Sequence, residues 1–306
     1  MIHTEHSHLR VAALSHPGAS GKNNEDRFAV SSYQVSADRP IPSLFAVVSD
    51  GIGGHRAGEV AAEMAVNTIS HFVAQSDASH PIQILQEAVS EASQAISAHA
   101  QSDASLHGMG ATCACTWVIG GRLYTASIGD SRIYLIRKGR VWRLTTDHTW
   151  VQEALDRGVL TPEQAQGHPN MHIIHRYLGS PQPPNVDVRL RVGKGESDTQ
   201  ARSNQGMRLS AGDVLLLCTD GLTDLVSDEE MVTQIHGENL TAEAQALGDL
   251  ANDRGGHDNI TVILLAVPQP AKKQLPGTQL PWLMAMLIGC MLLVAISICV
   301  WTLFQP

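Results

Sequence analysis

Aspartates flank four apolar runs that are typical of β-strands. Three of the runs end at Asp50, Asp130 and Asp220, and a fourth begins just after Asp258. If one sheet system brings these strand ends together, at least four carboxylates lie in one small volume. Like charges at contact distance raise carboxylate pKa values, whereas a divalent cation allows every carboxylate to stay charged. The pattern therefore predicts a metal site with oxygen ligands.

The surroundings of these aspartates support the same chemistry. An Asp-Gly pair after a single strand is ordinarily a turn, so the argument depends on its repetition along the chain. Asp50 opens a glycine-dense loop that allows backbone carbonyls to approach a ligand closely. Glu25 and Asp26 add two adjacent carboxylates before another short strand. Mg²⁺ and Mn²⁺ are the hard ions that favour such oxygen ligands.

The amino-acid composition excludes some classes of binding partner. The 306 residues include 21 basic and 30 acidic residues, so the formal net charge is −9, which argues against a nucleic-acid surface. The five cysteines show no zinc-like spacing, and Cys113 and Cys115 alternate on a predicted strand as two buried residues on one face. Of the fifteen histidines, His172 and His175 flank a short apolar pair without a matching ligand set. Proteins and small ions are the expected partners.

The C-terminal segment differs from the rest of the chain. Residues 282–304 contain no charged side chain in 23 positions. As a helix they extend about 34 Å, enough for a hydrocarbon core of about 30 Å, and we expect a transmembrane helix. Lys272 and Lys273 precede it, which favours a single-pass membrane protein with its large domain in the cytoplasm. The predicted organisation is a domain over 1–267, a linker over 268–281 and a span over 282–304.

The elements that must position the aspartates follow from hydrophobic periodicity. Helical spacing predicts helices over 58–74, 82–98 and 242–252, and two capping-box patterns start shorter helices near Thr161 and Ser227. Residues 193–206 are polar and rich in Gly and Ser, which predicts a surface loop or insertion. Strands grouped by hairpins with long helices outside them predict an α+β layered sandwich. The expected strands are 10–14, 27–30, 44–49, 112–119, 123–128, 133–137, 141–144, 214–218 and 260–267.

Seven short motifs in order along the chain resemble those of the metal-dependent, type 2C protein serine/threonine phosphatases, especially their bacterial branch. Each motif alone is weak evidence, whereas seven in the right order are highly specific. The resemblance spans roughly residues 9–267. The motifs are Asn24–Asp26, Asp50–Glu59, Gly108–Thr112, Ile128–Arg132, Thr146–His148, Cys218–Leu222 and Gly255–Thr261.

The resemblance implies a two-metal phosphomonoester hydrolase on two antiparallel β-sheets packed as a sandwich and flanked by helices, an αββα fold. It implies that Asp50 bridges two Mn²⁺ or Mg²⁺ ions and that the Gly51 carbonyl binds one of them. Three further implied roles involve the remaining carboxylates. Asp220 and Asp258 complete the other ion site, Asp130 with Asp220 holds a third, weaker ion, and Glu25 and Asp26 orient water around the ions. The segment over residues 151–180 resembles a mobile flap beside the active site.

Two positions depart from the family pattern. The family usually has a phosphate-binding arginine five residues before Asp26, and that position here is Gly21. Lys22 is adjacent and is a candidate substitute, although a lysine offers a point charge rather than a bidentate fork, and a solvated loop lysine is an equal alternative. Members from animals have a histidine, implied as general acid, where this chain has Ile52.

These expectations combine into one functional hypothesis. The chain is expected to remove phosphate from phosphoserine and phosphothreonine in proteins, at the cytoplasmic face of a bacterial membrane and in partnership with a cognate kinase. A hydrolase of small phosphoesters is one alternative. A catalytically silent module that binds phosphoproteins is another, favoured only by Gly21 and opposed by the presence of all four core aspartates.

Overall fold

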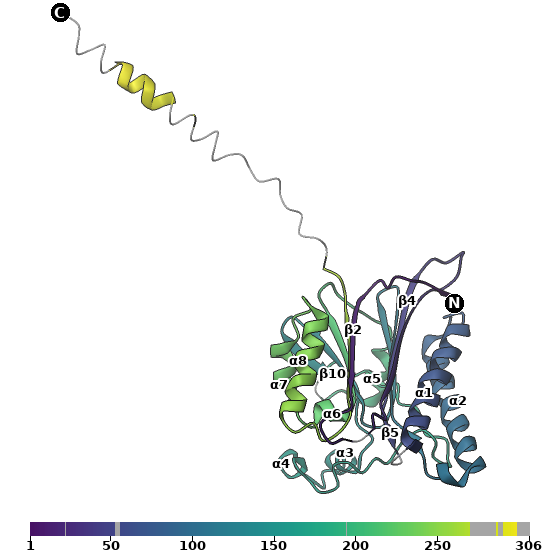
Figure 1. Ribbon diagram of the computed structural model, residues 1–306. Helices are drawn as coiled ribbons and strands as arrows, with labels where there is room; N and C mark the ends of the chain where they lie inside the picture. The colour runs from purple at the N-terminus through teal and green to yellow at the C-terminus, as the bar shows by residue number, and fades with distance from the viewer. Residues whose placement is uncertain (22, 53–55, 194, 270–285, 287–289, 299–306) are drawn as a thin grey trace, which may run out of the picture. The chain divides into compact units, whose positions relative to one another are not determined.

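Two antiparallel sheets lie face to face, and helices cover the outer face of each sheet (Figure 1). The first sheet has the order β1-β3-β4-β7-β8-β11 and the second the order β10-β9-β12-β13-β2. This is the predicted α+β sandwich with the layer order helix, sheet, sheet, helix.

The computed structural model describes residues 1–21, 23–52, 56–193, 195–269, 286 and 290–298. Its strands are β1 (Ile2–His3), β2 (Arg10–His16), β3 (Arg27–Gln34), β4 (Pro42–Ser49), β5 (Gly51–Ile52), β6 (Gly110–Ala111), β7 (Cys113–Ile119), β8 (Arg122–Ile128), β9 (Arg132–Arg137), β10 (Arg140–Arg143), β11 (Met207–Arg208), β12 (Val214–Cys218) and β13 (Ile260–Ala266). Its helices are α1 (Arg56–Gln75), α2 (Pro81–Ser102), α3 (Trp150–Asp156), α4 (Pro162–Ala165), α5 (Asp198–Ser203), α6 (Asp220–Thr223), α7 (Asp228–Gln234) and α8 (Leu240–Asp253), with a 3₁₀ turn at Ala104–Leu106.

Strand β4 shows why the central strands are apolar on both faces. Side chains alternate across a strand, so neighbouring residues point into different layers. Phe45 and Val47 pack with residues of α1 and α2, whereas Leu44 and Ala46 pack between the two sheets. Strands that are buried on both sides lose the polar alternation of a surface strand, and the sequence accordingly shows them as continuous apolar runs.

The helices form the outer layers because each carries one apolar stripe. Ile69 of α1 and Leu85 of α2 are fully buried against the first sheet. Leu247 and Ala251 of α8 are buried against the second sheet, with Leu216 of β12 in the same cluster. The sandwich thus has three apolar layers, one between the sheets and one under each group of helices.

Two local predictions have clear outcomes. The capping boxes at Thr161 and Ser227 are both present and begin α4 and α7. The prediction of a surface loop over 193–206 was incomplete, because the segment contains α5. Its start is a third capping box, in which Ser197 accepts a hydrogen bond from the Gln200 amide and the Gln200 side chain accepts one from the Ser197 amide.

The chain divides into two units, Met1–Pro268 and Gln269–Pro306. Most of the predicted span over 282–304 lies outside the described residues, which here are Met286 and the helical residues 290–298. Across the described parts of the chain, the structure contains no helix of sufficient length and apolar character to cross a membrane.

Candidate metal centre

The strand ends that carry the aspartates meet at one end of the sandwich. Asp50 separates β4 from β5, Asp130 lies in the turn between β8 and β9, and Asp220 begins α6 two residues after β12. Asp258 lies in the loop before β13, and Asp26 directly precedes β3. The carboxylates interact across these elements, since Asp50 is affected by the charges of Asp26, Asp220 and Asp130.

Burial and mutual repulsion perturb these acids strongly. Burial is the largest cause in each case, and neighbouring carboxylates add to it. The pKa of Asp26 is raised to about 7 and that of Asp220 to about 6, while the pKa values of Asp50 and Asp130 lie well above the ordinary aspartate value. Without a cation the cluster therefore retains protons near neutral pH.

Three carboxylate oxygens in the cluster are buried and have no hydrogen-bond partner among the described residues. They are Oδ1 of Asp26, Oδ1 of Asp130 and Oδ1 of Asp220. Buried polar atoms are almost always hydrogen-bonded, and one that is not requires a specific explanation. Divalent cations that take oxygen ligands supply that explanation, so the donor set fits Mn²⁺ or Mg²⁺.

Glu25 and Gly51 approach the cluster over the first turn of α1. A Cβ atom at Gly58 would overlap the Glu25 carboxylate and would lie 2.8 Å from the Gly51 carbonyl oxygen. Glycine at position 58 therefore leaves room for both oxygen-bearing groups beside Asp50. Of the predicted site residues, Glu25, Asp26, Asp50, Gly51, Asp130, Asp220 and Asp258 all lie at this end of the sandwich.

Buried hydroxyl and amide groups hold the carboxylates in place, and the sequence interpretation assigned no role to them. Thr112 accepts a hydrogen bond from the Asp50 amide at 2.9 Å, and its own amide donates to the Asp50 carbonyl at 2.8 Å. The Thr219 hydroxyl donates to Asp26 Oδ2 at 2.8 Å. Asn259 Oδ1 accepts the Glu25 amide at 2.7 Å. Each of these residues adjoins a predicted aspartate or strand end, and that adjacency was the available signal.

His148 connects the turn that carries Asp130 to the segment over 151–180. Its ring Nδ1 accepts a hydrogen bond from the Gly129 amide at 3.0 Å, and its backbone amide donates to the Gly129 carbonyl at 2.9 Å. Because Nδ1 is an acceptor, the proton lies on Nε2, 3.3 Å from Asp187 Oδ2. The His148 carbonyl accepts the His175 amide at 2.8 Å. His148 is thus a structural link between Asp130 and that segment.

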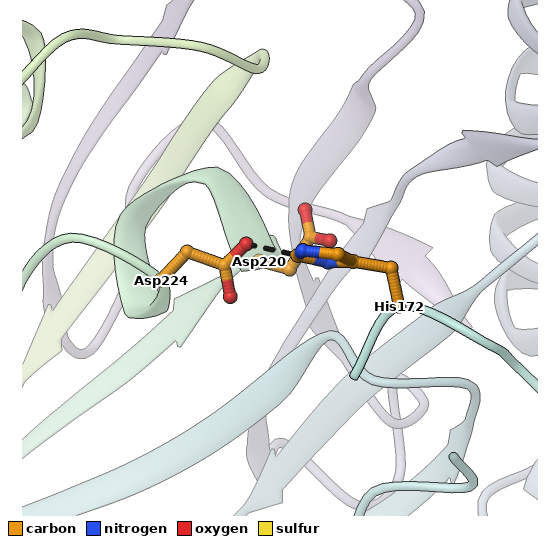
Figure 2. Close-up of side chains that lie close together, drawn as sticks. All are labelled: His172, Asp220 and Asp224. Atoms are coloured by element: carbon orange, nitrogen blue, oxygen red, sulfur yellow. Dashed lines mark ion pairs between the residues drawn. The ribbon is translucent and has the colours of Figure 1, made fainter. Parts of the chain in front are cut away.

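Figure 2 shows that His172 reaches the same region from the segment over 151–180. Its ring lies close to Asp220 and Asp224, and the ligand atoms of the three residues all lie within 4.8 Å of one another. The prediction that His172 has no matching ligand set was wrong. A cavity of about 180 Å³ adjoins this group, and Asp130 also lines it.

The predicted phosphate-binding position has an unusual backbone. Gly21 has φ +72°, in the left-handed region that disfavours side chains, although the space around it is open. Lys22, the predicted substitute for the missing arginine, lies outside the described residues. The absence of arginine at position 21 is thus consistent with the local backbone.

Replacing Gly21 with arginine tests whether a phosphate clamp is missing. We expect Gly21→Arg to lower the KM for a phosphothreonine peptide, because a guanidinium forms a bidentate pair with phosphate. The positive φ costs about 1–2 kcal/mol of stability for any residue with a side chain. Gly21→Ala has the same backbone cost without the charge and is the matched control. An equal or higher KM in Gly21→Arg than in Gly21→Ala would show that another group already binds the phosphate.

Comparisons with a family profile and with individual proteins lead to the same family. Residues 15–250 match the profile of the family described as protein phosphatase 2C. The chain is 36% identical over 260 residues to the serine/threonine protein phosphatase PstP of Mycobacterium tuberculosis, covering 85% of this chain and 45% of PstP. It is 35% identical over 248 residues to the serine/threonine phosphatase stp of Listeria innocua, covering 79% of this chain and 90% of the relative.

The solved structures agree with the sequence relatives. The crystal structure of the catalytic domain of PstP in complex with two manganese ions matches with a TM-score of 0.68 at 33% identity. That match covers 85% of this chain and 99% of the crystallised chain. The present chain spans less than half the length of full-length PstP.

Proposed function

The chain belongs to the protein phosphatase 2C family of serine/threonine phosphatases, and from this membership we propose that it hydrolyses phosphoserine and phosphothreonine in proteins. Its cofactor is a pair of divalent ions, Mn²⁺ or Mg²⁺, consistent with the two manganese ions in the catalytic domain of PstP. The observation that carries the proposal is that five aspartates lie together at one end of the sandwich. Three of their buried carboxylate oxygens have no hydrogen-bond partner among the described residues.

The proposed ligand set follows the position of each carboxylate. Asp50 adjoins the charges of three other aspartates and is proposed to bridge the two ions. The Gly51 carbonyl serves one ion, and Asp220 with Asp258 serves the other. Asp130, with Asp220, is proposed to hold a third, weaker ion; burial and the charge of Asp220 both raise its pKa.

In the reaction, the protein's own residues are proposed to position the attacking water and to contact the charged phosphate. When bound, a pair of divalent ions activates water and holds phosphoryl oxygens for in-line attack. Glu25 and Asp26 are proposed to orient the attacking water as hydrogen-bond acceptors, with Asp26 itself fixed by Thr219. Lys22 remains the proposed phosphate contact. The side chain at position 52 is isoleucine, so it has no proton to donate to a serine or threonine leaving group.

The test uses the fragment Met1–Val267 with a phosphothreonine peptide. We expect hydrolysis only with added Mn²⁺ or Mg²⁺, because the buried carboxylates need the ions to remain charged. Phosphate release is measured with and without a chelator, and p-nitrophenyl phosphate is the small-ester comparison. Undiminished hydrolysis in the chelator would contradict the metal assignment. Preference for the small ester would favour the small-phosphoester alternative, and binding without hydrolysis would favour a silent module.

The setting proposed for this activity is the cytoplasmic face of a bacterial membrane, where phosphoprotein substrates of a cognate kinase are encountered. The support is the uncharged stretch over 282–304, preceded by a short linker over 268–281 that contains Lys272 and Lys273. The proposed domain boundary therefore lies at residue 267. Comparing the full chain with the fragment in membrane and supernatant fractions tests this part, and equal recovery of both in the supernatant would contradict it.

A further inference from the structure

Five basic side chains lie together at the end of the sandwich opposite the metal centre, where the edges of the two sheets meet. The Arg137 guanidinium, at the end of β9, donates to the Arg208 carbonyl in β11 at 3.2 Å. This contact joins the second sheet to the first. The five residues, called the basic cluster below, are Arg122 at the start of β8, Arg208 in β11, and Arg137, Lys138 and Arg140 around the β9–β10 turn.

Most of the basic cluster has no acidic partner among the described residues. Asp213 pairs with Arg137 at 2.6 Å. The other four members are exposed, and none of them forms an ion pair with an acidic side chain in the described part of the chain. Since the formal net charge of the protein is −9, the cluster is a local excess of positive charge. Such a patch attracts an anionic surface.

The positive charges of the basic cluster are placed against local structural preference. Arg122 lies directly opposite Arg208 across the β8–β11 pair. Arg140 lies opposite Arg137 across the β9–β10 pair, and like charges directly opposite each other destabilise a sheet. Lys138 has φ +53°, a left-handed conformation that favours asparagine or glycine in a two-residue hairpin turn. Folding stability does not account for these choices, so the charges are better explained by binding.

The last strand of the domain ends beside the basic cluster. The Val267 amide donates to the Asp213 carbonyl at 2.9 Å, and Asp213 is the acid that pairs with Arg137. The sequence after residue 267 contains two lysines, no acidic residue and the uncharged stretch over 282–304. The charge of the cluster and the place where the chain leaves the domain thus favour the same partner, an anionic membrane surface.

We propose that the basic cluster docks the domain on a membrane surface that contains anionic phospholipids, an inference that rests on the membrane setting proposed above. Each Lys or Arg near such a surface strengthens binding about fivefold, so the four exposed cations give about a 1,000-fold preference over a neutral surface. Strand β8 has 7 residues and carries Arg122 at its start, and Asp130 follows its end. The metal centre therefore lies about 20 Å from the cluster and stays open to soluble substrates.

The test uses the fragment Met1–Val267, which contains every residue of the three buried apolar layers and corresponds to the crystallised catalytic domain of PstP. Co-sedimentation is measured with vesicles of phosphatidylcholine alone and of phosphatidylcholine mixed with phosphatidylglycerol. We expect binding to the mixed vesicles only, weakening as salt rises. The double variant Lys138→Gln, Arg140→Gln should bind about 30-fold more weakly and keep the parent kcat for a phosphothreonine peptide.

The matched control is the double variant Arg157→Gln, Arg254→Gln, which removes the same charge at the metal-centre end of the sandwich. Both are exposed arginines paired with a glutamate, and vesicle binding should be unchanged. The proposal is overturned if the fragment does not bind the mixed vesicles or if the two double variants bind them equally. Binding to duplex DNA through Lys138 and Arg140, without binding to vesicles, would overturn the lipid assignment.

The full chain distinguishes this proposal from the membrane setting on which it rests. If the full chain enters membranes but the fragment does not bind the mixed vesicles, docking by the basic cluster is wrong and the setting stands. If the fragment binds the mixed vesicles through Lys138 and Arg140 but the full chain is recovered in the supernatant fraction of cells, the anchored setting is wrong and the lipid-binding surface stands. Peptide hydrolysis by the same fragment reports separately on the proposed phosphatase activity.

Discussion

Asparagine at position 50 is expected to lower kcat for a phosphothreonine peptide by at least about 100-fold. Loss of a residue that only contacts a metal ligand costs about 10–100-fold, and loss of a ligand itself should cost more. Asp50 is proposed to contact both ions, and an amide carries no charge to hold them. Asp220→Asn should have a comparable effect, since Asp220 is proposed to serve two ion positions. Steady-state kinetics with saturating Mn²⁺ or Mg²⁺ provides the measurement.

A second measurement on the same variant separates lost chemistry from lost folding. Asp50→Asn removes one charge from a buried acidic cluster, so the metal-free variant should unfold at a Tm equal to or above that of the metal-free parent at pH 8. Asp249→Asn makes the same chemical change at an exposed position on α8 and should leave kcat unchanged. A kcat for Asp50→Asn within threefold of the parent would show that the bridging role is wrong.

The metal-free protein is expected to lose stability as pH rises from about 4 to about 7. In the folded chain the pKa of Asp26 is raised to about 7 and that of Asp220 to about 6, against an ordinary value of 3.8. Between these values the folded state holds more protons than the unfolded state, so the free energy of unfolding falls with pH. The stabilisation from these two protonated aspartates is complete below pH 3.8, the ordinary aspartate pKa. It is lost as the pH rises through their raised pKa values of about 6 and about 7.

Bound divalent ions should reverse this trend, because they favour the charged carboxylates. The rise in Tm on adding Mn²⁺ or Mg²⁺ should therefore be small at pH 5 and large at pH 8. Asp187 does not affect stability in this pH range. Burial raises its pKa, but hydrogen bonds from His148 and Arg189 outweigh burial and lower the pKa, so its contribution to stability is lost only at more acidic pH. Thermal unfolding at several pH values, with chelator or with ions, provides the measurement. A metal-induced shift in Tm that is equal at pH 5 and pH 8 would contradict the account.

Local signals in the sequence were sufficient for most of the secondary structure. The apolar stripe predicted over 58–74 is α1, and the stripe over 82–98 is α2 with one residue more at its start and four more at its end. Strand β3 is longer than predicted, extending to Gln34, because it pairs along its whole length with β4. That pairing depends on residues outside the strand, so a local reading ended it too early. By contrast, α5 had a local signal in Ser197 and Gln200 that its polar surroundings concealed.

The histidines show the limit of reasoning from spacing. His172 lies 48 residues before Asp220 and 52 before Asp224, so no local pattern connects them. Their proximity arises because the segment over 151–180 folds back, with the Trp150 amide donating to Ile173 and the His175 amide to His148. Thr112 and Thr219 each adjoin a predicted strand end or aspartate, but their hydrogen bonds to Asp50 and Asp26 join segments far apart in the chain, so the sequence did not show which group each one holds.

The sequence by itself determined the chemistry of the centre, because carboxylates at the ends of apolar strands specify oxygen ligands and a divalent charge. It also determined the layered architecture, because strand and helix periods are local properties. The tertiary structure alone decided which carboxylate oxygens lack a hydrogen-bond partner among the described residues, which aspartates have a raised pKa, and that His172 lies close to Asp220 and Asp224. Those properties depend on distances between segments far apart in the chain, which packing sets and composition does not.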